Sequence, residues 1–249
     1  MEKDVGTQYE RRFINQHALL KASMIVILLA LLIAISGCGD KEPAQRKAFI
    51  EFIQTRLLAT QTLAVPQLSE EQIKSFGEYS NDYAVITDFH QQMDTELNAS
   101  LAPVFSSMNS VTSVNALLEQ RDRLQEMANN SAHLAEKIDA IKLQADARHD
   151  ALKQPQDLKE VYDQAYNKVV SKPAALAEQV FTLLPQVLKQ IVVKADFIKS
   201  QGENVTISGS TLQFATQSQL DKYNAIQKKL VPLNAQLMEL SRQMQQMVH

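Results

Sequence analysis

Apolar side chains recur at helical spacing along most of the chain, and the pattern is most regular in two long segments. In residues 113–153, two interleaved series with seven-residue spacing are mostly apolar: Leu117, Leu124, Ser131, Ile138, Ala145 and Leu152, with Gln120, Met127, Leu134, Ile141 and Arg148 between them. In residues 217–247, both series are wholly apolar: Tyr223, Leu230, Leu237 and Met244, with Ile226, Leu233, Leu240 and Met247. This spacing predicts long helices that pack nearly parallel, as in coiled coils and helical bundles.

Two earlier helices are predicted from an apolar face and from a capping signal. A first helix is expected over 44–62, where four apolar residues share one face: Phe49, Ile50, Ile53 and Leu57. Ser69 and Gln72 have the spacing of a capping box, in which each side chain binds the main-chain amide of the other residue. Because a box of this kind begins a helix, a second helix is expected over 69–109.

Prolines delimit the helices in the second half of the chain. Pro155 ends the segment with the first heptad pattern, and Pro173 separates two further helices, since proline lacks the amide that a helix interior needs. These helices are expected over 157–170 and 173–201. Pro185 should kink the second of them, and Pro232 should bend the last helix without ending it.

The apolar period changes from 3.6 to 2 just before the last helix. Residues 205–207 and 211–214 are rich in β-branched and apolar side chains, and they flank the turn sequence Ser208-Gly209-Ser210. This arrangement is typical of a β-hairpin. The sequence as a whole therefore predicts a mainly α fold, an elongated antiparallel helical bundle with one small β-hairpin before the last helix.

The N-terminal region has the layout of a secretory signal. Residues 22–36 form an uncharged apolar run that follows Arg11, Arg12 and Lys21. The run ends in the sequence Ile35-Ser36-Gly37-Cys38, which is typical of a lipobox. In this interpretation Ile35, Ser36 and Gly37 are recognised by the lipoprotein signal peptidase, and fatty acyl chains are attached through Cys38. The alternative is an uncleaved membrane anchor, for which the run is slightly shorter than the roughly 20 residues needed.

Lipidation gives the chain three parts. Residues 1–37 are the signal peptide, 38–43 hold the lipidated cysteine and a short tether, and 44–249 form a single helical periplasmic domain. Cys38 is the single cysteine of the sequence, so the domain has no internal disulfide. Because Gly39, not Asp, follows Cys38, the inner leaflet of the outer membrane is favoured over the inner membrane.

Composition excludes several classes of function. The formal net charge of −3 offers no basic excess for nucleic acid. With six glycines in 249 residues, the sequence contains neither a phosphate-binding loop nor a dinucleotide-binding fingerprint. We therefore expect no nucleic-acid partner and no cofactor.

No catalytic or metal-ligating constellation is evident. His90 and Asp94 could share a helical face, with Asp88 nearby, but two or three such groups do not make a metal site, and a solvated polar face is the favoured interpretation. Asp146 and His149 have the spacing of a contact within one helix. The sequence predicts that the protein is not an enzyme.

Several stretches resemble one known family. They include Asp40-Lys41-Glu42, the run from Gln45 to Phe52, Lys142-Leu143-Gln144-Ala145-Asp146-Ala147, Asp157-Leu158-Lys159, Asp163-Gln164-Ala165 and Tyr223-Asn224. In these the chain is similar to the YiaF-like lipoproteins of enteric bacteria, a family catalogued as a domain of unknown function. The resemblance implies a lipoprotein of the Gram-negative envelope without an assigned activity, cofactor or catalytic residue.

Two functions follow as hypotheses. In the first, the domain is a tethered structural or interaction module that engages another envelope protein. In the alternative, it is a lipoprotein that binds a small molecule or lipid in a cavity between helices or beneath the hairpin. Four apolar residues are candidates to line that cavity, although a place in the core is favoured for them: Phe181, Phe197, Ile207 and Phe214.

Overall fold

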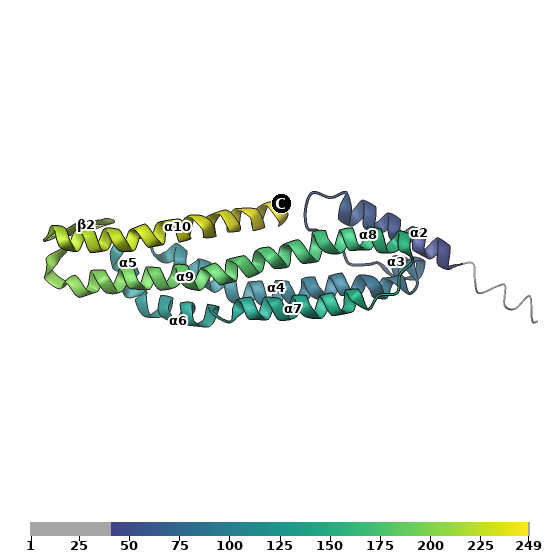
Figure 1. Cartoon of the computed structure of the whole chain (residues 1–249), viewed down its shortest axis with the longest axis horizontal. Coiled ribbons are helices and arrows are strands. Elements are labelled where there is room, and N and C mark those ends of the chain that lie inside the picture. Colours follow the sequence, from purple (N-terminus) through teal and green to yellow (C-terminus); the bar gives the residue numbers. More distant parts are fainter. Residues whose placement is uncertain (1–40, 249) are drawn as a thin grey trace, which may run out of the picture. The chain divides into compact units, whose positions relative to one another are not determined.

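The structure is a computed structural model and describes residues 41–248. Residues Met1–Ala48 and Phe49–His249 form two compact units, and the packing described below is that of the second unit. Most of the described residues are helical, and one two-stranded antiparallel sheet precedes the last helix (Figure 1). The mainly α fold with a late β-hairpin is therefore confirmed.

The first described helix has a regular and a widened part. Helix α2 spans Glu42–Phe52 and continues directly into a π-helical segment, η1, at Ile53–Leu58. Phe49, Ile53 and Leu57 are fully buried, as expected for residues on one face. The predicted helix over 44–62 is thus confirmed, with an end four residues earlier than expected.

The second predicted helix is divided at a glycine. The capping box is present, since the Ser69 hydroxyl accepts from the Gln72 amide and the Gln72 side chain accepts from the Ser69 amide. It begins helix α3 at Glu70–Phe76, and helix α4 follows at Tyr79–Ser110. Gly77 separates them with a φ of 58°, a value that L side chains rarely adopt. The prediction of one uninterrupted helix over 69–109 is therefore wrong at this point.

The third predicted helix is also divided, but its heptad pattern is confirmed. Three helices occupy the segment: α5 at Val114–Glu119, α6 at Arg121–Ser131 and α7 at Leu134–Asp150. All members of the first series are buried except Leu152, which is half-buried. Gln120 and His133, at the two divisions, have ψ near 0°, so each division is a local turn that leaves the buried side in place.

Pro173 does not separate two helices. Helix α8 at Gln156–Tyr166, the π-helical segment η2 at Asn167–Ser171 and helix α9 at Lys172–Gln201 follow one another without a break. Pro173 has no amide to donate to the carbonyl of Val169, four residues earlier. The chain responds by widening into a π-helical turn just before the proline instead of ending the helix. The prediction of separate helices over 157–170 and 173–201 is wrong for this reason.

The hairpin and the last helix are confirmed. Strands β1 at Val205–Ser208 and β2 at Thr211–Phe214 pair antiparallel, and Gly209 supplies a φ of 62° in the turn. Helix α10 spans Gln217–Val248 and continues through Pro232, as expected. Each of its eight heptad residues is buried or half-buried.

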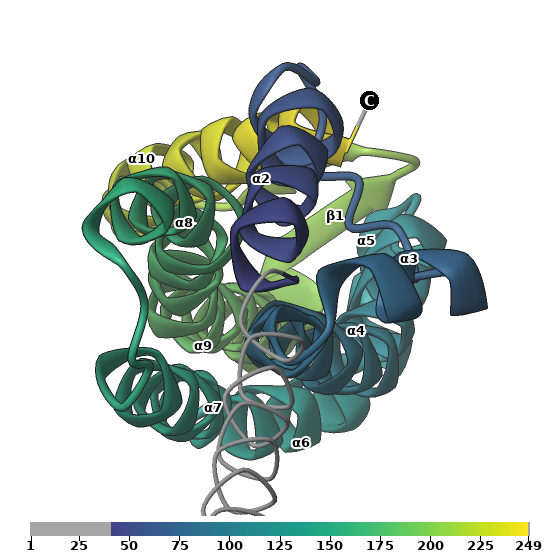
Figure 2. The same cartoon turned by 90° about the vertical axis from the view of Figure 1, so that its right-hand side faces the viewer.

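Helix α9 is the central helix of the Phe49–His249 unit. It lies beside α6, α7 and α10, while α4 lies beside α7 (Figures 1 and 2). Its buried side chains include Val180, Phe181, Leu184, Val187, Leu188 and Ile198. Pro185 is buried within it and does not end the helix. Among the helices of residues 41–248, none is long and apolar enough to cross a membrane.

Candidate functional site

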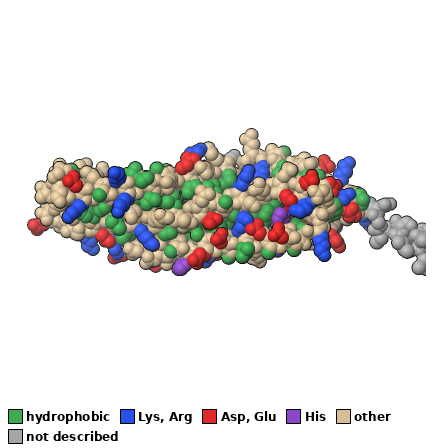
Figure 3. Space-filling view, in the orientation of Figure 1, with side chains coloured by type: hydrophobic (Ala, Val, Ile, Leu, Met, Phe, Trp, Pro, Cys, Tyr) green, Lys and Arg blue, Asp and Glu red, His purple; other side chains and the backbone are tan. Residues whose placement is uncertain are grey.

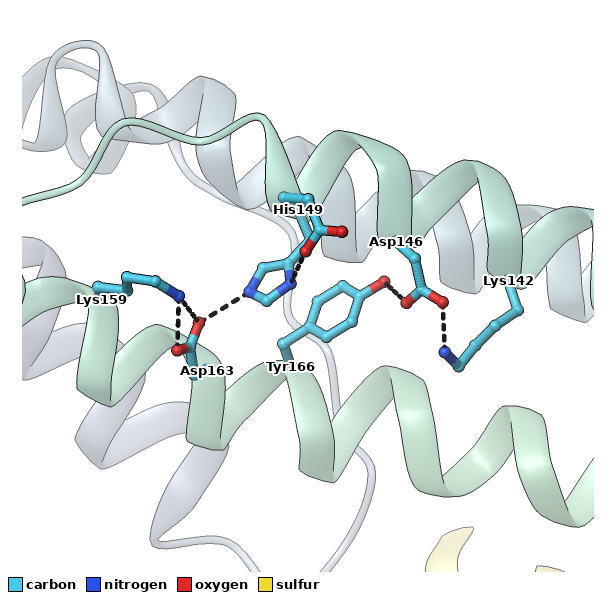
Figure 4. A network of polar contacts seen from close by, with 7 residues as sticks. Lys142, Asp146, His149, Lys159, Asp163 and Tyr166 are labelled. Atoms are coloured by element: carbon cyan, nitrogen blue, oxygen red, sulfur yellow. Dashed lines mark hydrogen bonds and ion pairs between the residues drawn. The ribbon is translucent and has the colours of Figure 1, made fainter.

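A cluster of interacting charged and polar side chains joins α7 to α8 (Figure 4). We call it the α7–α8 network, and it consists of Lys142, Asp146 and His149 on α7 with Lys159, Asp163 and Tyr166 on α8. Within each helix the three residues have the spacing i, i+4 and i+7, which places them on one face. The two faces are turned toward one another, as the labelled side chains show.

His149 is the centre of one half of the network. Its Nε2 lies 2.9 Å from Oδ1 of Asp163. Lys159 donates to both oxygens of the same carboxylate, at 2.9 and 2.7 Å. The imidazole also stacks on the ring of Tyr166, with 4.1 Å between the ring centroids and 5° between the planes. Its Nδ1 lies 3.9 Å from Oδ1 of Asp150, and Tyr162 stacks on it with 5.7 Å between the ring centroids. The ring of His149 is thus held by two carboxylates and two aromatic rings.

Asp146 is the centre of the other half. It accepts a hydrogen bond of 2.8 Å from the Tyr166 hydroxyl and one of 2.6 Å from Nζ of Lys142. Tyr166 therefore belongs to both halves, since it stacks on His149 and donates to Asp146. In the sequence, Asp146 and His149 had the spacing of partners, but in the structure each of them binds a residue of α8.

The network sets the charge states of its carboxyl groups. Partial burial alone would raise the pKa of Asp163, but the hydrogen bonds from Lys159 and His149 outweigh it and hold that pKa below the ordinary value. Burial and the bonds from Lys142 and Tyr166 oppose one another in the same way at Asp146, and its pKa is also lowered. Burial, followed by the bond to Asp146, raises the pKa of the Tyr166 hydroxyl, which therefore stays protonated as a donor.

The contacts of this network run between two helices and hold them together. A histidine beside a carboxylate is one part of a hydrolytic site, but a nucleophile must lie within hydrogen-bond reach of it. Among residues 41–248, no serine or threonine hydroxyl hydrogen-bonds His149. The described residues also contain no group of three or more potential ligands that could hold a metal ion. Sequence spacing indicated only the pair Asp146 and His149 on one helix and gave no sign that α7 and α8 would pair.

The residues considered for a metal site bind different partners. Nε2 of His90 lies 2.5 Å from the carbonyl oxygen of Val169, and a carbonyl only accepts, so this nitrogen carries the proton. His90 thus supplies the donor that Pro173 lacks. Asp88 accepts a hydrogen bond of 2.7 Å from Arg148 on α7. The expectation of a solvated polar face is therefore wrong for His90, which is half-buried and binds the main chain of η2.

Replacing His90 by glutamine should reduce the pH dependence of stability. Burial lowers the pKa of His90 below its ordinary value of 6.5. At a pH between the lowered pKa of the folded protein and 6.5, His90 is protonated in the unfolded chain but neutral in the folded protein. The stability that the neutral ring contributes is therefore present above pH 6.5 and is lost as the pH falls through the lowered pKa. His90→Gln keeps an N–H donor without titrating, so its free energy of unfolding should fall less between about pH 7 and about pH 5.

Urea unfolding at the two pH values measures this difference. His133→Gln is the matched control, since the His133 side chain is 77% exposed. It should leave the pH dependence of the wild-type protein unchanged. Equal pH dependence in the wild-type protein and in His90→Gln would contradict the role assigned to His90.

The side chains considered for an apolar cavity are packed. Phe181 is 1% exposed in the core. Phe197 and Phe214 are 5.9 Å apart between ring centroids, and Phe214 is 5.2 Å from Tyr223. Ile207 is half-buried on the inner side of the hairpin. Phe181 is thus a core residue, whereas Phe197, Ile207 and Phe214 are half-buried. The predicted lipidation residue Cys38 and the recognition residues Ile35, Ser36 and Gly37 lie outside the described residues.

Comparisons with known proteins identify relatives of the chain. A family model described as "Protein of unknown function (DUF3053)" matches residues 25–248. Uncharacterized protein YiaF of Escherichia coli strain K12 is 38% identical over 208 residues, which cover 84% of this chain and 86% of that protein. Proteins of the same description from Escherichia coli O157:H7 and Shigella flexneri match to the same extent. No solved structure matches significantly. The resemblance that the sequence indicated is thus confirmed.

Proposed function

The chain belongs to the DUF3053 family of proteins of unknown function, and on that premise we propose that it is a lipoprotein of the Gram-negative cell envelope. Signal peptidase removes residues 1–37, and acyl chains on Cys38 attach the protein to a membrane, with the inner leaflet of the outer membrane favoured. The helical part faces the periplasm and acts by binding another envelope protein. It holds no cofactor and performs no catalysis.

The proposal is carried by the position of Cys38. The cysteine follows an uncharged apolar run and three residues that fit the signal peptidase, and it is the single cysteine of the chain. The family match begins at residue 25 and therefore includes Cys38 and most of the run. One acyl chain gives only marginal membrane binding, whereas several chains on one residue give stable attachment. Lipidation thus supplies an anchor that residues 41–248 do not supply through a spanning helix.

A binding role is supported by the exposed apolar side chains of the helices. Figure 3 shows hydrophobic side chains gathered over α9 and α10 on the face in view. The large apolar residues that are most exposed are Ile73, Phe105, Leu143, Val193, Leu220, Val231 and Met238. Met238 is 65% exposed and Val231 is 61% exposed, both on α10. The seven are spread over α3, α4, α7, α9 and α10, but Val231 and Met238, seven residues apart, share one face of α10. Exposed apolar side chains on one face are typical of surfaces that bind proteins.

Acyl labelling of intact cells tests the anchor. The wild-type protein should incorporate labelled palmitate and sediment with membranes. Cys38→Ala should lose the label completely and retain its signal peptide, because the peptidase acts on the lipidated cysteine. A Cys38→Ala protein that is labelled and processed like the wild type would refute the proposal.

Site-specific crosslinking tests the binding role separately. A photoreactive amino acid at Met238 should give a discrete adduct with an envelope protein in intact cells. The same probe at Lys199, which is exposed on α9 and charged, is the matched control and should give none. The absence of a specific adduct at Met238, Val231 and Leu143 alike would contradict the binding role while leaving the anchor intact.

A further inference from the structure

An apolar groove lies where the end of α4 and helices α5 and α6 face α9 and α10. Its volume is about 350 Å³. Leu117 and Leu124, both buried, form its floor, while Ile191 of α9 and Leu230 of α10 line its sides. Val231, 61% exposed, stands at its rim. A groove of this size is at the small end of the range of about 300–1,000 Å³ that is common for ligand sites.

Lys194 supplies the only charge among the residues that line this groove. Its Nζ lies 5.7 Å from the centroid of the Tyr223 ring. Within residues 41–248, no carboxylate forms an ion pair with Lys194. The other polar side chains of the lining are the amides of Gln227 and Asn234. Nε2 of Gln227 donates to the Tyr223 hydroxyl at 3.2 Å, and a side-chain amide has two N–H donors, so one remains for a ligand. The groove therefore combines an apolar floor with a cation and neutral donors, and it contains no acid.

Three other grooves include carboxylates, among them the groove beside Leu143 with Asp139, Asp146 and Glu178. The groove beside His90 includes Asp94, and the groove between α9 and α10 that lies near Leu240 includes Glu178 and Glu239. A carboxylate in the lining opposes an anionic ligand.

A further groove, beside Lys172 and of about 460 Å³, also has a single lysine and no acid, but half of its lining residues are glutamines and Leu176 is its one buried apolar side chain. The groove at Lys194 is thus distinguished by two buried leucines, Leu117 and Leu124, beside a lysine and no acid.

The geometry points to a binding site for a single-chain anionic amphiphile at Lys194. The acyl chain lies against Leu117, Leu124 and Ile191, and the anionic head pairs with the Lys194 ammonium. The amides of Gln227 and Asn234 donate hydrogen bonds to the same head. Each methylene removed from water adds to the affinity, so a chain of moderate length gives substantial affinity. The volume suits one chain, whereas a phospholipid with two chains exceeds it. This function goes beyond the proposed anchoring and binding roles.

The shared chemistry of the ligand is one acyl chain with an anionic head, and it has two natural sources. A free fatty acid has a carboxylate, and a lysophospholipid has a phosphate. A neutral chain would leave the ammonium without a counter-ion and is therefore excluded as the preferred ligand. A helix of a partner protein is the competing occupant, since exposed apolar residues also bind proteins.

Photolabelling of the full chain reconstituted in phosphatidylcholine vesicles tests the site. The probes are dodecanoic acid and lysophosphatidylglycerol, each with a diazirine in the acyl chain, together with the methyl ester of the first probe as a neutral control. At least one anionic probe should label peptides that contain Leu117, Leu124, Ile191 or Leu230. The relative labelling by the two probes identifies the source.

Two variants and a matched control separate charge from packing. Lys194→Gln should reduce groove labelling by about threefold to tenfold, as expected for loss of one partly exposed ion pair. Lys189→Gln, on the exposed side of the same helix, should leave it unchanged. Val231→Trp should reduce it by filling the rim, with the thermal unfolding midpoint measured to verify folding.

Four results would overturn the inference. One is labelling that maps outside the groove, and another is labelling by the methyl ester that equals labelling by the acid. A third is an equal effect of Lys194→Gln and Lys189→Gln. The fourth is recovery of a protein crosslinked at Val231 with no lipid labelling of the groove, which would assign the groove to a partner helix.

Discussion

Phe49→Ala should lower the free energy of unfolding by about 3–5 kcal/mol, the range for truncating a buried aromatic side chain. Phe49 is fully buried, and its ring centroid lies 5.3 Å from that of Phe76 and 6.4 Å from that of Tyr83. It also lies 6.3 Å from Tyr162 on α8. Alanine would leave a cavity among three separate helices, which cannot all move to fill it. Urea unfolding followed by far-ultraviolet circular dichroism measures the loss.

Phe105→Ala is the matched control for this prediction. Phe105 lies on α4 and is 38% exposed, so the same change removes less buried surface and leaves a gap open to solvent instead of a cavity. Its cost should be at least about 1 kcal/mol smaller than that of Phe49→Ala. If the two variants lost the same stability, the aromatic cluster around Phe49 would not be the centre of packing that its burial indicates.

The heptad pattern predicted burial better than it predicted helix bounds. Over 113–153 the first series lies on the buried side, although the chain turns near Gln120 and His133. A heptad pattern records which side of a segment faces its neighbours, and a short turn need not change that side. Neither position is a glycine or proline, so the sequence contained no strong signal for the interruptions.

Contacts between distant parts of the chain could not be predicted from the sequence. In the α7–α8 network, the spacing of Asp146 and His149 was visible, but their partners Tyr166 and Asp163 belong to another helix. His90 and Val169 are 79 residues apart. Spacing rules identify partners within one helix, whereas these pairs depend on which helices become neighbours. The interpretation of Cys38 rests on sequence alone, because a lipobox is a linear signal.

Both π-helical segments leave main-chain carbonyls that side chains from elsewhere satisfy. Val169 in η2 is bound by His90, as described above. The carbonyls at and just after the end of η1 are bound by Lys168, which is itself in η2. Its Nζ donates to Leu57 at 2.6 Å, to Leu58 at 3.2 Å and also to the carbonyl of Thr60. The two irregular segments therefore stabilise one another, and Lys168 is the link between them.

Lys168→Met should lower the free energy of unfolding by about 2–4 kcal/mol. Methionine keeps an unbranched apolar stem but has no hydrogen-bond donor, so three carbonyls lose their charged donor. A buried acceptor without a donor costs about 1–3 kcal/mol, and water that reaches these carbonyls recovers part of that cost. Lys189→Met is the control, since Lys189 is exposed and makes no hydrogen bond within residues 41–248. This variant should change the free energy of unfolding by less than about 0.5 kcal/mol. Chemical unfolding measures both, and hydrogen exchange of residues 57–63 should accelerate in Lys168→Met alone. If hydrogen exchange of residues 57–63 were unchanged in Lys168→Met, the end of η1 would not depend on Lys168, which would contradict the role assigned to it.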